Sequence, residues 1–366
     1  MSELLDLTEP RPSLTVGVDV SPAYDLLLTL WLLEGAEDID TFDLGREWFE
    51  EVRQAMSTEL REELAEVSSS GGATWIVLLG LVNNSPDPHD LDAFFSWLEE
   101  ADGVELRKAF LSLKCHDLAE EQLVAGARGD QNAIEEALSG AGEHPEWKAN
   151  LTQLLEVPSE ELGPRLAGLL SRFRDEAYSQ PEKQFSEPIA RDSAAKSALI
   201  PTTSATRMIE LSTNGVEYEV PSHVQTLLLA PSVVIRPWSL LAEHNSTYVL
   251  CYPVADEFLT TDPDSPPQSL INAYKALSDD RRLRILHRLS TEDATLQELA
   301  DHLDVAKSTV HHHIGLLRAA GLVRVKVQGH KEQSLYGLRR EAFEEAMRLM
   351  NLYLANAKPI DEVGKT

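Results

Sequence analysis

Apolar residues follow two different periods along the chain. Between residues 22 and 178 they recur every three or four positions, which is the spacing of helices with one buried face. Ser21 is a suitable N-cap for the first of these helices, and Pro22 suits its first helical position. Gly/Ser and Asn/Pro breaks separate further helices, expected over about residues 44–66, 90–100, 103–115, 119–127, 130–139, 146–155 and 159–178.

Strand-like segments precede and follow this helical region. The expected strands are LTVGVDVS (14–21), TRMIEL (206–211), VEYEV (216–220), TLLLAPSVVIRPW (226–238) and TYVLCYPV (247–254). The second and third would form a hairpin about a turn at Ser212–Gly215, and the others would complete a small sheet. Residues 179–204 are rich in Ser, Pro, Ala and charge, which predicts a loop or flexible segment.

Two short helices joined by a tight turn are expected between residues 295 and 320. Thr295 with Glu298 three residues later has the pattern of a capping box, and an apolar stripe continues the helix to about residue 303. Asp304–Ala306 then turn into a second helix, which Gly321 ends. Two helices joined in this way form a helix-turn-helix.

Three consecutive histidines, His311–His313, lie in the second helix, residues 307–320. Successive helical residues point about 100° apart, so the three imidazoles cannot converge on one metal ion. The buried stripe consists of Val310, Ile314 and Leu317. His313 flanks this stripe, and we expect it to pack in a partly buried, hydrogen-bonded position.

The opposite face of this helix is polar. His311 and His312 point away from the core, in rows with Lys307 and Ser308. Gly315 keeps the face low, so that another large surface could approach closely. Such a face suits insertion into the major groove of double-stranded DNA. The alternative is a solvated face that carries histidines by accident, and the flanking sequence decides between the two.

The residues after this helix predict a β-hairpin, or wing, over 322–338. Leu322–Val327 alternates apolar and basic residues, QGHKEQ contains the turn, and Ser334–Leu338 returns. The basic residues of this wing are Arg324, Lys326, His330 and Lys331.

ALSDDRRLRILHRL (276–289) followed by LDVAKSTVHHHIGLLRAAGLV (303–323) closely resembles the winged-helix transcription factors of the arsenic-repressor (ArsR) type. The likeness runs from about Gln268 to Leu354, about a quarter of the chain, and implies a regulator that binds double-stranded DNA. Arg318 falls where a phosphate contact is common in the family, and serine is usual at position 311. The resemblance implies DNA contacts by Lys307, Ser308, Thr309, His311, His312, Arg318, Arg324, Lys326, His330 and Lys331.

Metal-sensing members of that family carry cysteine in the helix before the recognition helix, or histidine and acidic ligands on the last helix. LQELADHL (296–303) has no cysteine, and EAFEEAMRLMNLYLAN (341–356) has no histidine. We therefore expect no metal site and no cofactor.

Apolar residues recur at helical spacing on the last helix. Ordinary core packing is one interpretation. The resemblance implies instead a homodimer interface with the first helix of the module, formed by Leu270, Tyr274, Phe343, Met347, Met350 and Leu354. A dimer would place two recognition helices about one DNA turn apart on a pseudo-palindrome.

The distribution of charge favours DNA contact only near the C-terminus. The 366-residue chain has a net charge of −29, yet residues 266–354 hold 13 Lys/Arg against 11 Asp/Glu, whereas residues 1–265 hold 17 against 48. The acidic part should repel DNA and restrict binding to the module, unless its acidity serves only solubility. Two cysteines, no signal peptide and no membrane-spanning apolar run predict a cytoplasmic protein.

The acidic part carries no motif that assigns a function. An input domain for a small-molecule effector is the first interpretation, because a large helical domain rich in Trp and Tyr can line an apolar pocket. Candidate lining residues are Tyr24, Trp31, Trp75, Trp97 and Trp238, although core packing is the commoner role for each. A protein-interaction domain and an enzyme without a recognisable motif are the alternatives.

Taken together, these patterns predict a mainly α fold with small β parts (α+β). The expected division is an acidic regulatory domain over 1–255 with a strand-rich end at about 205–255, a linker over 256–267, a winged helix-turn-helix over 268–354 and a tail over 355–366.

Overall fold

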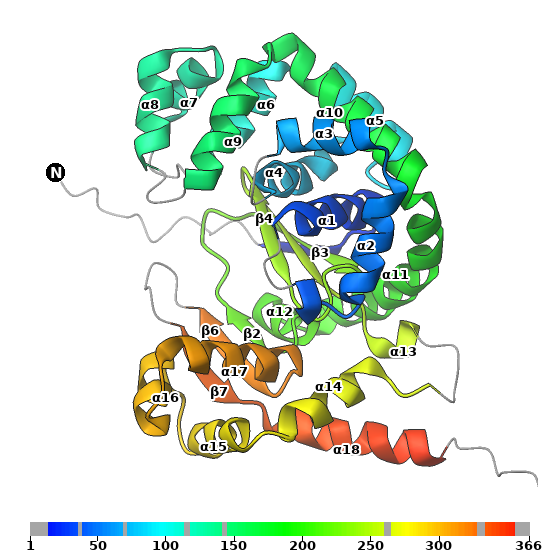
Figure 1. Cartoon of the computed structure of the whole chain (residues 1–366), viewed down its shortest axis with the longest axis vertical. Coiled ribbons are helices and arrows are strands. Elements are labelled where there is room, and N and C mark those ends of the chain that lie inside the picture. The colour runs from blue at the N-terminus through cyan, green and yellow to red at the C-terminus, as the bar shows by residue number, and fades with distance from the viewer. Residues whose placement is uncertain are drawn as a thin grey trace, which may run out of the picture. The chain divides into compact units, whose positions relative to one another are not determined.

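The computed structural model describes residues 14–35, 39–68, 72–112, 118–140, 145–259, 265–327 and 334–355. In these ranges the chain is mainly helical with two small sheets, which confirms the predicted fold class (Figure 1). The chain divides into two compact units. The first unit comprises Met1–Ser197 and Pro221–Tyr252, and the second comprises Ala198–Val220 and Pro253–Thr366. None of the described helices is both long and apolar enough to cross a membrane.

The first unit contains a four-stranded sheet in the order β1-β3-β5-β4. Its strands are β1 (Thr15–Val18), β3 (Thr226–Ser232), β4 (Leu240–His244) and β5 (Thr247–Pro253). β1 pairs with β3 in parallel, and β4 pairs with β5 as an antiparallel hairpin. The two central strands, β3 and β5, are almost completely buried, which explains their continuous apolar sequences.

Two apolar helices, α1 (Pro22–Gly35) and α4 (Ala73–Leu81), pack on each other and against this sheet (Figure 1). α1 begins as expected, because the Ser21 Oγ accepts a hydrogen bond of 3.2 Å from the Ala23 N–H. Gly80 lets α4 approach β4 closely, since a Cβ there would lie 3.0 Å from the Glu243 carbonyl oxygen.

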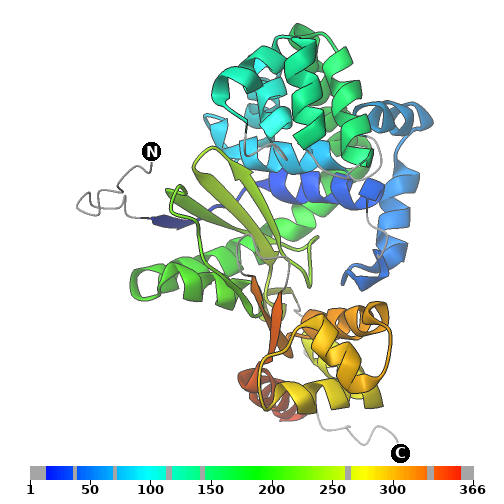
Figure 2. The ribbon, with the colours of Figure 1, turned by 90° about the vertical axis from the view of Figure 1, so that its left-hand side faces the viewer.

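The other helices of the first unit surround this centre, and Figure 2 shows those between residues 91 and 173 gathered into one bundle, coloured cyan to green. The α-helices are α2 (Gly45–Ala55), α3 (Thr58–Val67), α5 (Leu91–Glu100), α6 (Gly103–Ser112), α7 (Glu120–Ala127), α8 (Gln131–Gly140), α9 (Pro145–Glu156), α10 (Ser159–Phe173) and α11 (Ser179–Leu199). Short turns of other helix types are η1 (Ile39–Thr41), η2 (Val82–Asn84) and the π-helical η3 (Arg174–Tyr178).

The second unit combines a winged helix-turn-helix with a segment from the middle of the chain. Its elements are η4 (Ile200–Thr202), α12 (Ala205–Ser212), β2 (Val216–Tyr218), α13 (Asp256–Leu259), α14 (Gln268–Leu277), α15 (Asp280–Leu289), α16 (Leu296–Leu303), α17 (Lys307–Ala319), β6 (Val323–Val327), β7 (Leu335–Leu338) and α18 (Arg340–Ala355). The sheet order is β2-β6-β7, in which β2 is parallel to β6 and the wing strands β6 and β7 are antiparallel.

The predicted hairpin over 206–220 is wrong. Residues 205–212 form α12, in which Met208, Ile209 and Ser212 are buried at helical spacing. The Ser204 hydroxyl caps this helix by accepting from the Arg207 N–H at 3.4 Å, a signal in the sequence that the apolar run TRMIEL obscured. Val216–Tyr218 is a strand, as predicted, but it pairs with β6. Residues 198–220 therefore belong to the second unit, not to the expected regulatory domain.

The predicted loop over 179–204 is wrong as well, because most of it is α11. Pro181, Phe185, Ile189 and Asp192 are buried at helical spacing, a pattern hidden by the polar composition. The helix expected over 44–66 is two helices, α2 and α3. α4 was missed because it is apolar on every side and so lacks one-sided periodicity, and β4 was also missed.

Candidate DNA interface

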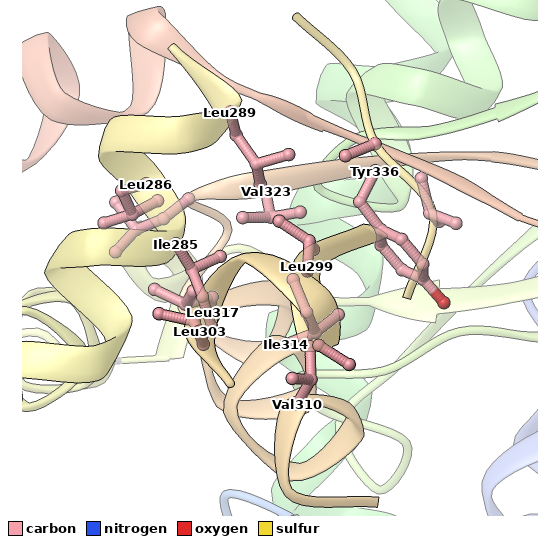
Figure 3. Packing of buried hydrophobic residues seen from close by; sticks show 14 of the residues in the cluster. Ile285, Leu286, Leu289, Leu299, Leu303, Val310, Ile314, Leu317, Val323 and Tyr336 are labelled. Atoms are coloured by element: carbon pink, nitrogen blue, oxygen red, sulfur yellow. The ribbon is translucent and has the colours of Figure 1, made fainter. Parts of the chain in front are cut away.

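The hydrophobic core of the second unit sets the direction in which α17 faces. Val310, Ile314 and Leu317 are buried, and they pack with Leu299 and Leu303 of α16 (Figure 3). The predicted stripe of α17 is therefore its core side, and the opposite side of the helix points away from that core.

Local interactions define the start of α16 and its end at the turn into α17. The Thr295 Oγ1 accepts from the Glu298 N–H at 3.3 Å, and the Glu298 carboxylate accepts from the Thr295 N–H at 2.8 Å, which completes the predicted capping box. Asp304 ends α16 with a φ of 55°, a left-handed conformation that Asp adopts more readily than most residues. The chain then enters α17 at Lys307.

The outer face of α17 is exposed and polar. Thr309 is half-buried. A Cβ built at Gly315 would meet no atom within 4 Å, and Gly315 has no side chain to protrude from the helix, so a large partner could approach the helix closely at this position. The exposed residues are Lys307, Ser308, His311 and His312. Ammonium, hydroxyl and imidazole groups of this kind can bond to base edges and to phosphates. Contact of these residues with DNA stays a prediction.

His313 differs from its two neighbours. It is only 8% exposed, and its Nδ1 lies 3.9 Å from the Asp279 Oδ1. Burial lowers the pKa of His313 despite that carboxylate, which favours the neutral imidazole. Asp279 itself caps α15, since its Oδ1 accepts from the Arg282 N–H at 3.0 Å. His313 therefore packs beside the start of α15, as predicted, but its buried Nδ1 has no hydrogen-bond partner among the described residues, so the expected hydrogen bond of that atom is not formed.

Two basic residues of the wing are engaged by carboxylates. The Arg324 guanidinium lies 3.1 Å from Asp293 and 3.5 Å from Glu217, and the Lys326 ammonium lies 3.2 Å and 3.5 Å from the same two side chains. Burial acts to raise the pKa of Asp293, but hydrogen bonds from Arg324 and Lys326 hold it below its usual value. Glu217 comes from β2, so the middle segment of the chain supplies part of this charge balance.

Three other residues that were predicted to contact DNA are Arg318, His330 and Lys331. Arg318 is half-buried, and burial lowers the pKa of its guanidinium, so the side chain does not extend freely from α17. His330 and Lys331 lie outside the described residues.

Arg339 is a structural residue of this unit that sequence reasoning missed. Its guanidinium donates to the carbonyl oxygens of Asn214 and Gly321, both at 2.8 Å. It thereby ties the turn before β2 to the end of the helix-turn-helix. No local pattern could have revealed this role, because it depends on a segment more than one hundred residues earlier in the chain.

The residues that were predicted to form the dimer interface differ in the exposed fraction of their side chains. Leu270 is buried within the unit, whereas Phe343 and Met350 are half-buried. Tyr274, Met347 and Leu354 are 46%, 65% and 62% exposed. Four further exposed apolar residues of this unit were not predicted, namely Leu199, Leu211, Leu283 and Leu352. α14 and α18 are in contact and together carry most of this apolar surface.

Among the described residues, no group of three or more His, Cys, Asp or Glu side chains is placed to hold a metal ion.

The C-terminal part of the chain is similar to known proteins. A family model described as a helix-turn-helix domain matches residues 277–326. The transcriptional repressor SdpR of Bacillus subtilis is 35% identical over 52 residues, which are 14% of this chain and 58% of SdpR. A cadmium resistance transcriptional regulatory protein, a CadC homolog of Staphylococcus aureus, is 31% identical over 64 residues, which are 17% of this chain and 53% of that protein.

The match therefore spans little more than half the length of these curated relatives. A solved crystal structure of an ArsR family transcriptional regulator is 30% identical, and the match covers 26% of this chain and 98% of that chain with a TM-score of 0.22. The matched residues contain the capping box, the buried stripe and the polar face of α17. The C-terminal part of this chain therefore contains a helix-turn-helix domain, and it is similar in sequence to transcriptional regulators of the ArsR type.

Proposed function

We propose that this protein is a sequence-specific transcriptional regulator that binds double-stranded DNA as a homodimer and takes its input through the first unit. The observation that carries the proposal is the exposed face of α17, which presents Lys307, Ser308, His311 and His312 opposite a fully packed apolar stripe. A helix of this shape fits the major groove, and the wing would lie along the backbone or the minor groove.

Charge supports this assignment of the DNA-binding surface. The winged-helix residues 266–354 are nearly balanced in charge, whereas residues 1–265 are strongly acidic. Phosphates attract cations and repel carboxylates, so the acidic part disfavours any other mode of docking on DNA. The proposed affinity therefore comes from the second unit.

The pairing of wing cations with carboxylates modifies the expected role of the wing. Arg324 and Lys326 both have Glu217 and Asp293 as neighbours. Each would have to exchange a carboxylate for a phosphate on binding, which reduces the net gain. Most of the base discrimination is accordingly assigned to α17 and not to the wing.

Dimerisation is supported by the apolar surface of α14 and α18. Met347 and Leu354 are long apolar side chains that stand largely in solvent within one chain. Large exposed apolar residues that lie close together are typical of a protein contact. A twofold dimer would present two copies of α17 to successive turns of the major groove.

The test is selection of binding sites by the full-length protein from random duplex DNA, followed by titration of the selected duplexes at two salt concentrations. We expect enrichment of a pseudo-palindrome with half-sites about one helical turn apart. Its affinity should exceed that of random duplex by at least about 10³-fold. Binding that is no tighter than to random duplex, with no enriched sequence, would contradict the proposed function.

A further inference from the structure

The first unit contains a cavity of about 580 Å³. This volume lies within the range of about 300–1,000 Å³ that is typical of small-molecule sites. It is lined by the start of α1 and the two residues before it, by His89, by Tyr178 of η3 and by residues of α11 between Glu182 and Ser193. None of the aromatic residues proposed from the sequence lines this cavity.

The walls of the cavity are mainly apolar, with a buried carboxyl group among them. Val20, Pro22, Phe185 and Ile189 contribute apolar surface. Asp25, in the first turn of α1, is 2% exposed. A mainly apolar wall with a few polar or charged groups is the usual composition of a site that both holds and orients a small organic molecule.

The described part of the structure gives Asp25 no basic partner. Its Oδ2 accepts a hydrogen bond of 3.1 Å from the Val233 N–H. Burial raises the pKa of Asp25 to about 6, although hydrogen bonds from Ser232, Val233 and Val234 act to lower it. Near neutral pH the carboxyl group is therefore largely charged, and a buried charge without a counter-charge is costly. A cation entering the cavity would remove part of that cost.

Tyr178 is a buried aromatic residue of the cavity wall and ends the π-helical turn η3. In this turn the Ser179 N–H reaches the Arg174 carbonyl oxygen five residues back. Pro181 follows two residues after Ser179 and has no N–H to donate to the regular α-helical hydrogen-bond pattern. Single π-turns inside helices occur frequently at functional sites, where they alter the direction of a side chain.

The electrostatic potential at this wall is negative. Burial, and then the charges of Asp25 and Glu182, raise the pKa of Tyr178. Glu182 is already held by Arg174 through hydrogen bonds of 2.9 and 3.1 Å. The basic residues of the lining, Lys183 and His89, are less suited to neutralise the buried Asp25, since Lys183 is exposed. His89 is exposed as well, and its Nδ1 is bonded to the Val20 carbonyl oxygen at 2.5 Å.

We propose that this cavity binds a small apolar molecule that carries a protonated amine, with Asp25 as the counter-charge and Tyr178 as part of the aromatic wall. An aromatic face also attracts a cation directly. The net charge of the chain, −29, favours the approach of cationic over anionic ligands.

The same site would act as the effector site if the proposed DNA-binding function holds. α11 lines the cavity, and the chain runs from it through η4 and α12 into β2, the strand that pairs with the wing and carries Glu217. A ligand that binds more tightly when α11 has one position than when it has another would shift α11 toward the first position. Because the chain continues from α11 into β2, this shift would also affect the segment whose Glu217 contacts Arg324 and Lys326.

The test uses the full-length protein and dansylcadaverine, a fluorescent aromatic probe with a terminal primary amine. Its matched control is N-butyl dansylamide, which has the aromatic group and a similar chain but no charge. We expect saturable enhancement of dansyl fluorescence by the amine, with an affinity at least about tenfold greater than that of the neutral analogue, equivalent to about 1.4 kcal/mol.

Three variants locate the binding. Asp25→Asn keeps a carbonyl oxygen that can accept from Val233 but removes the charge, so it should abolish the preference for the amine. Ala190→Trp fills the cavity from the exposed side of α11 and should abolish binding of both probes. Glu100→Gln removes the same charge at an exposed position at the end of α5 and should bind like the parent.

Equal binding of the two probes by the parent would overturn the proposal, as would unchanged amine binding by both Asp25→Asn and Ala190→Trp. Absence of saturable amine binding would overturn it too. Duplex titrations with and without the amine keep the two proposals apart. Amine binding that depends on Asp25 supports the site even where no duplex is bound, whereas duplex binding unaffected by saturating amine contradicts its role as an effector site.

Discussion

At the scale of single residues, three adjacent histidines in α17 occupy two environments. His313 packs beside the apolar stripe at 8% exposure, whereas His311 and His312 are exposed. The difference follows from the 100° rotation per residue of an α-helix once one face is buried. A neutral packing imidazole and two solvent-facing imidazoles should respond differently to mutation.

His312→Ala should weaken binding to the selected duplex by about 1–3 kcal/mol, because it removes an exposed side chain that we propose contacts the bases. The loss should depend on the sequence of the site, with little change for random duplex. Fluorescence anisotropy titration against both duplexes measures it. His302→Ala, which removes an exposed histidine from α16, is the control. Equal losses on both duplexes would exclude a role for His312 in base discrimination.

Glu34 makes the stability of the first unit dependent on pH. Its Oε2 accepts a hydrogen bond of 2.8 Å from the Trp75 Nε1, yet burial raises its pKa from 4.5 to about 7. Between these values the folded state keeps a proton that the unfolded chain has lost. The contribution of Glu34 to stability therefore falls as pH rises from about 4.5 to about 7, and changes little above that.

Glu34→Gln should reduce this pH dependence. The urea midpoint of the parent should fall between pH 5 and pH 8 by more than that of the variant. Tryptophan fluorescence is a suitable probe, because all six tryptophans belong to the first unit. Glu99→Gln, at an exposed position of α5, corrects for the change in net charge. If both variants kept the slope of the parent, Glu34 would not be the titrating group.

At the scale of elements, β2 is the least expected feature of the second unit. It adds a parallel strand to the outer edge of the wing, with Glu217 opposite Lys326 in the register. Main-chain hydrogen bonds cover an edge that would otherwise be open to association. The same strand places a carboxylate against two wing cations, so one short element both completes the sheet and weakens the positive charge of the wing.

Glu217→Gln should strengthen binding to duplexes of any sequence by a few-fold, since it frees positive charge on the wing for phosphate contact. The slope of log K against log salt should steepen by up to about 1. Glu219→Gln, an exposed position just after β2, removes the same charge outside the pairing and serves as the control. Identical salt slopes for the parent and Glu217→Gln would mean that the wing does not contact phosphate.

At the scale of the whole molecule, the chain combines a strongly acidic part with a nearly neutral winged helix-turn-helix. The apolar surface that α14 and α18 form is exposed to solvent in the second unit of one chain. Burial of Met347 and Leu354 in a twofold contact would gain about 1.5–3 kcal/mol for each side chain. Several such residues together can support a dimer.

Met347→Glu should therefore convert a dimer to a monomer at micromolar concentration, because it places charge in the contact. Sedimentation equilibrium of the parent and the variant measures the change. Leu241→Glu, which alters an exposed leucine of β4 in the first unit, should leave the dimer intact. A parent that is monomeric throughout, or a dimer that survives Met347→Glu, would contradict the assignment of this interface.

The sequence by itself determined the helix-turn-helix, the stripe of α17 and the wing strands, as well as the mainly α class of the fold. Apolar spacing, the Thr295–Glu298 capping box and the Gly321 helix end are properties of consecutive residues, and they act wherever those residues lie. The polar face of α17 follows from the same local geometry, so the positions of His311, His312 and His313 relative to the core were predicted correctly.

Only the tertiary structure decided the features that join distant segments. The pairing of β2 with β6, the contacts of Glu217 and Arg339, and the cavity between the start of α1 and α11 each require residues more than one hundred positions apart. Residues 179–204 were misassigned as a loop for a related reason: their polar composition concealed a pattern of burial that exists only because other elements cover it. Local propensity is weak there, and tertiary packing determines the helices.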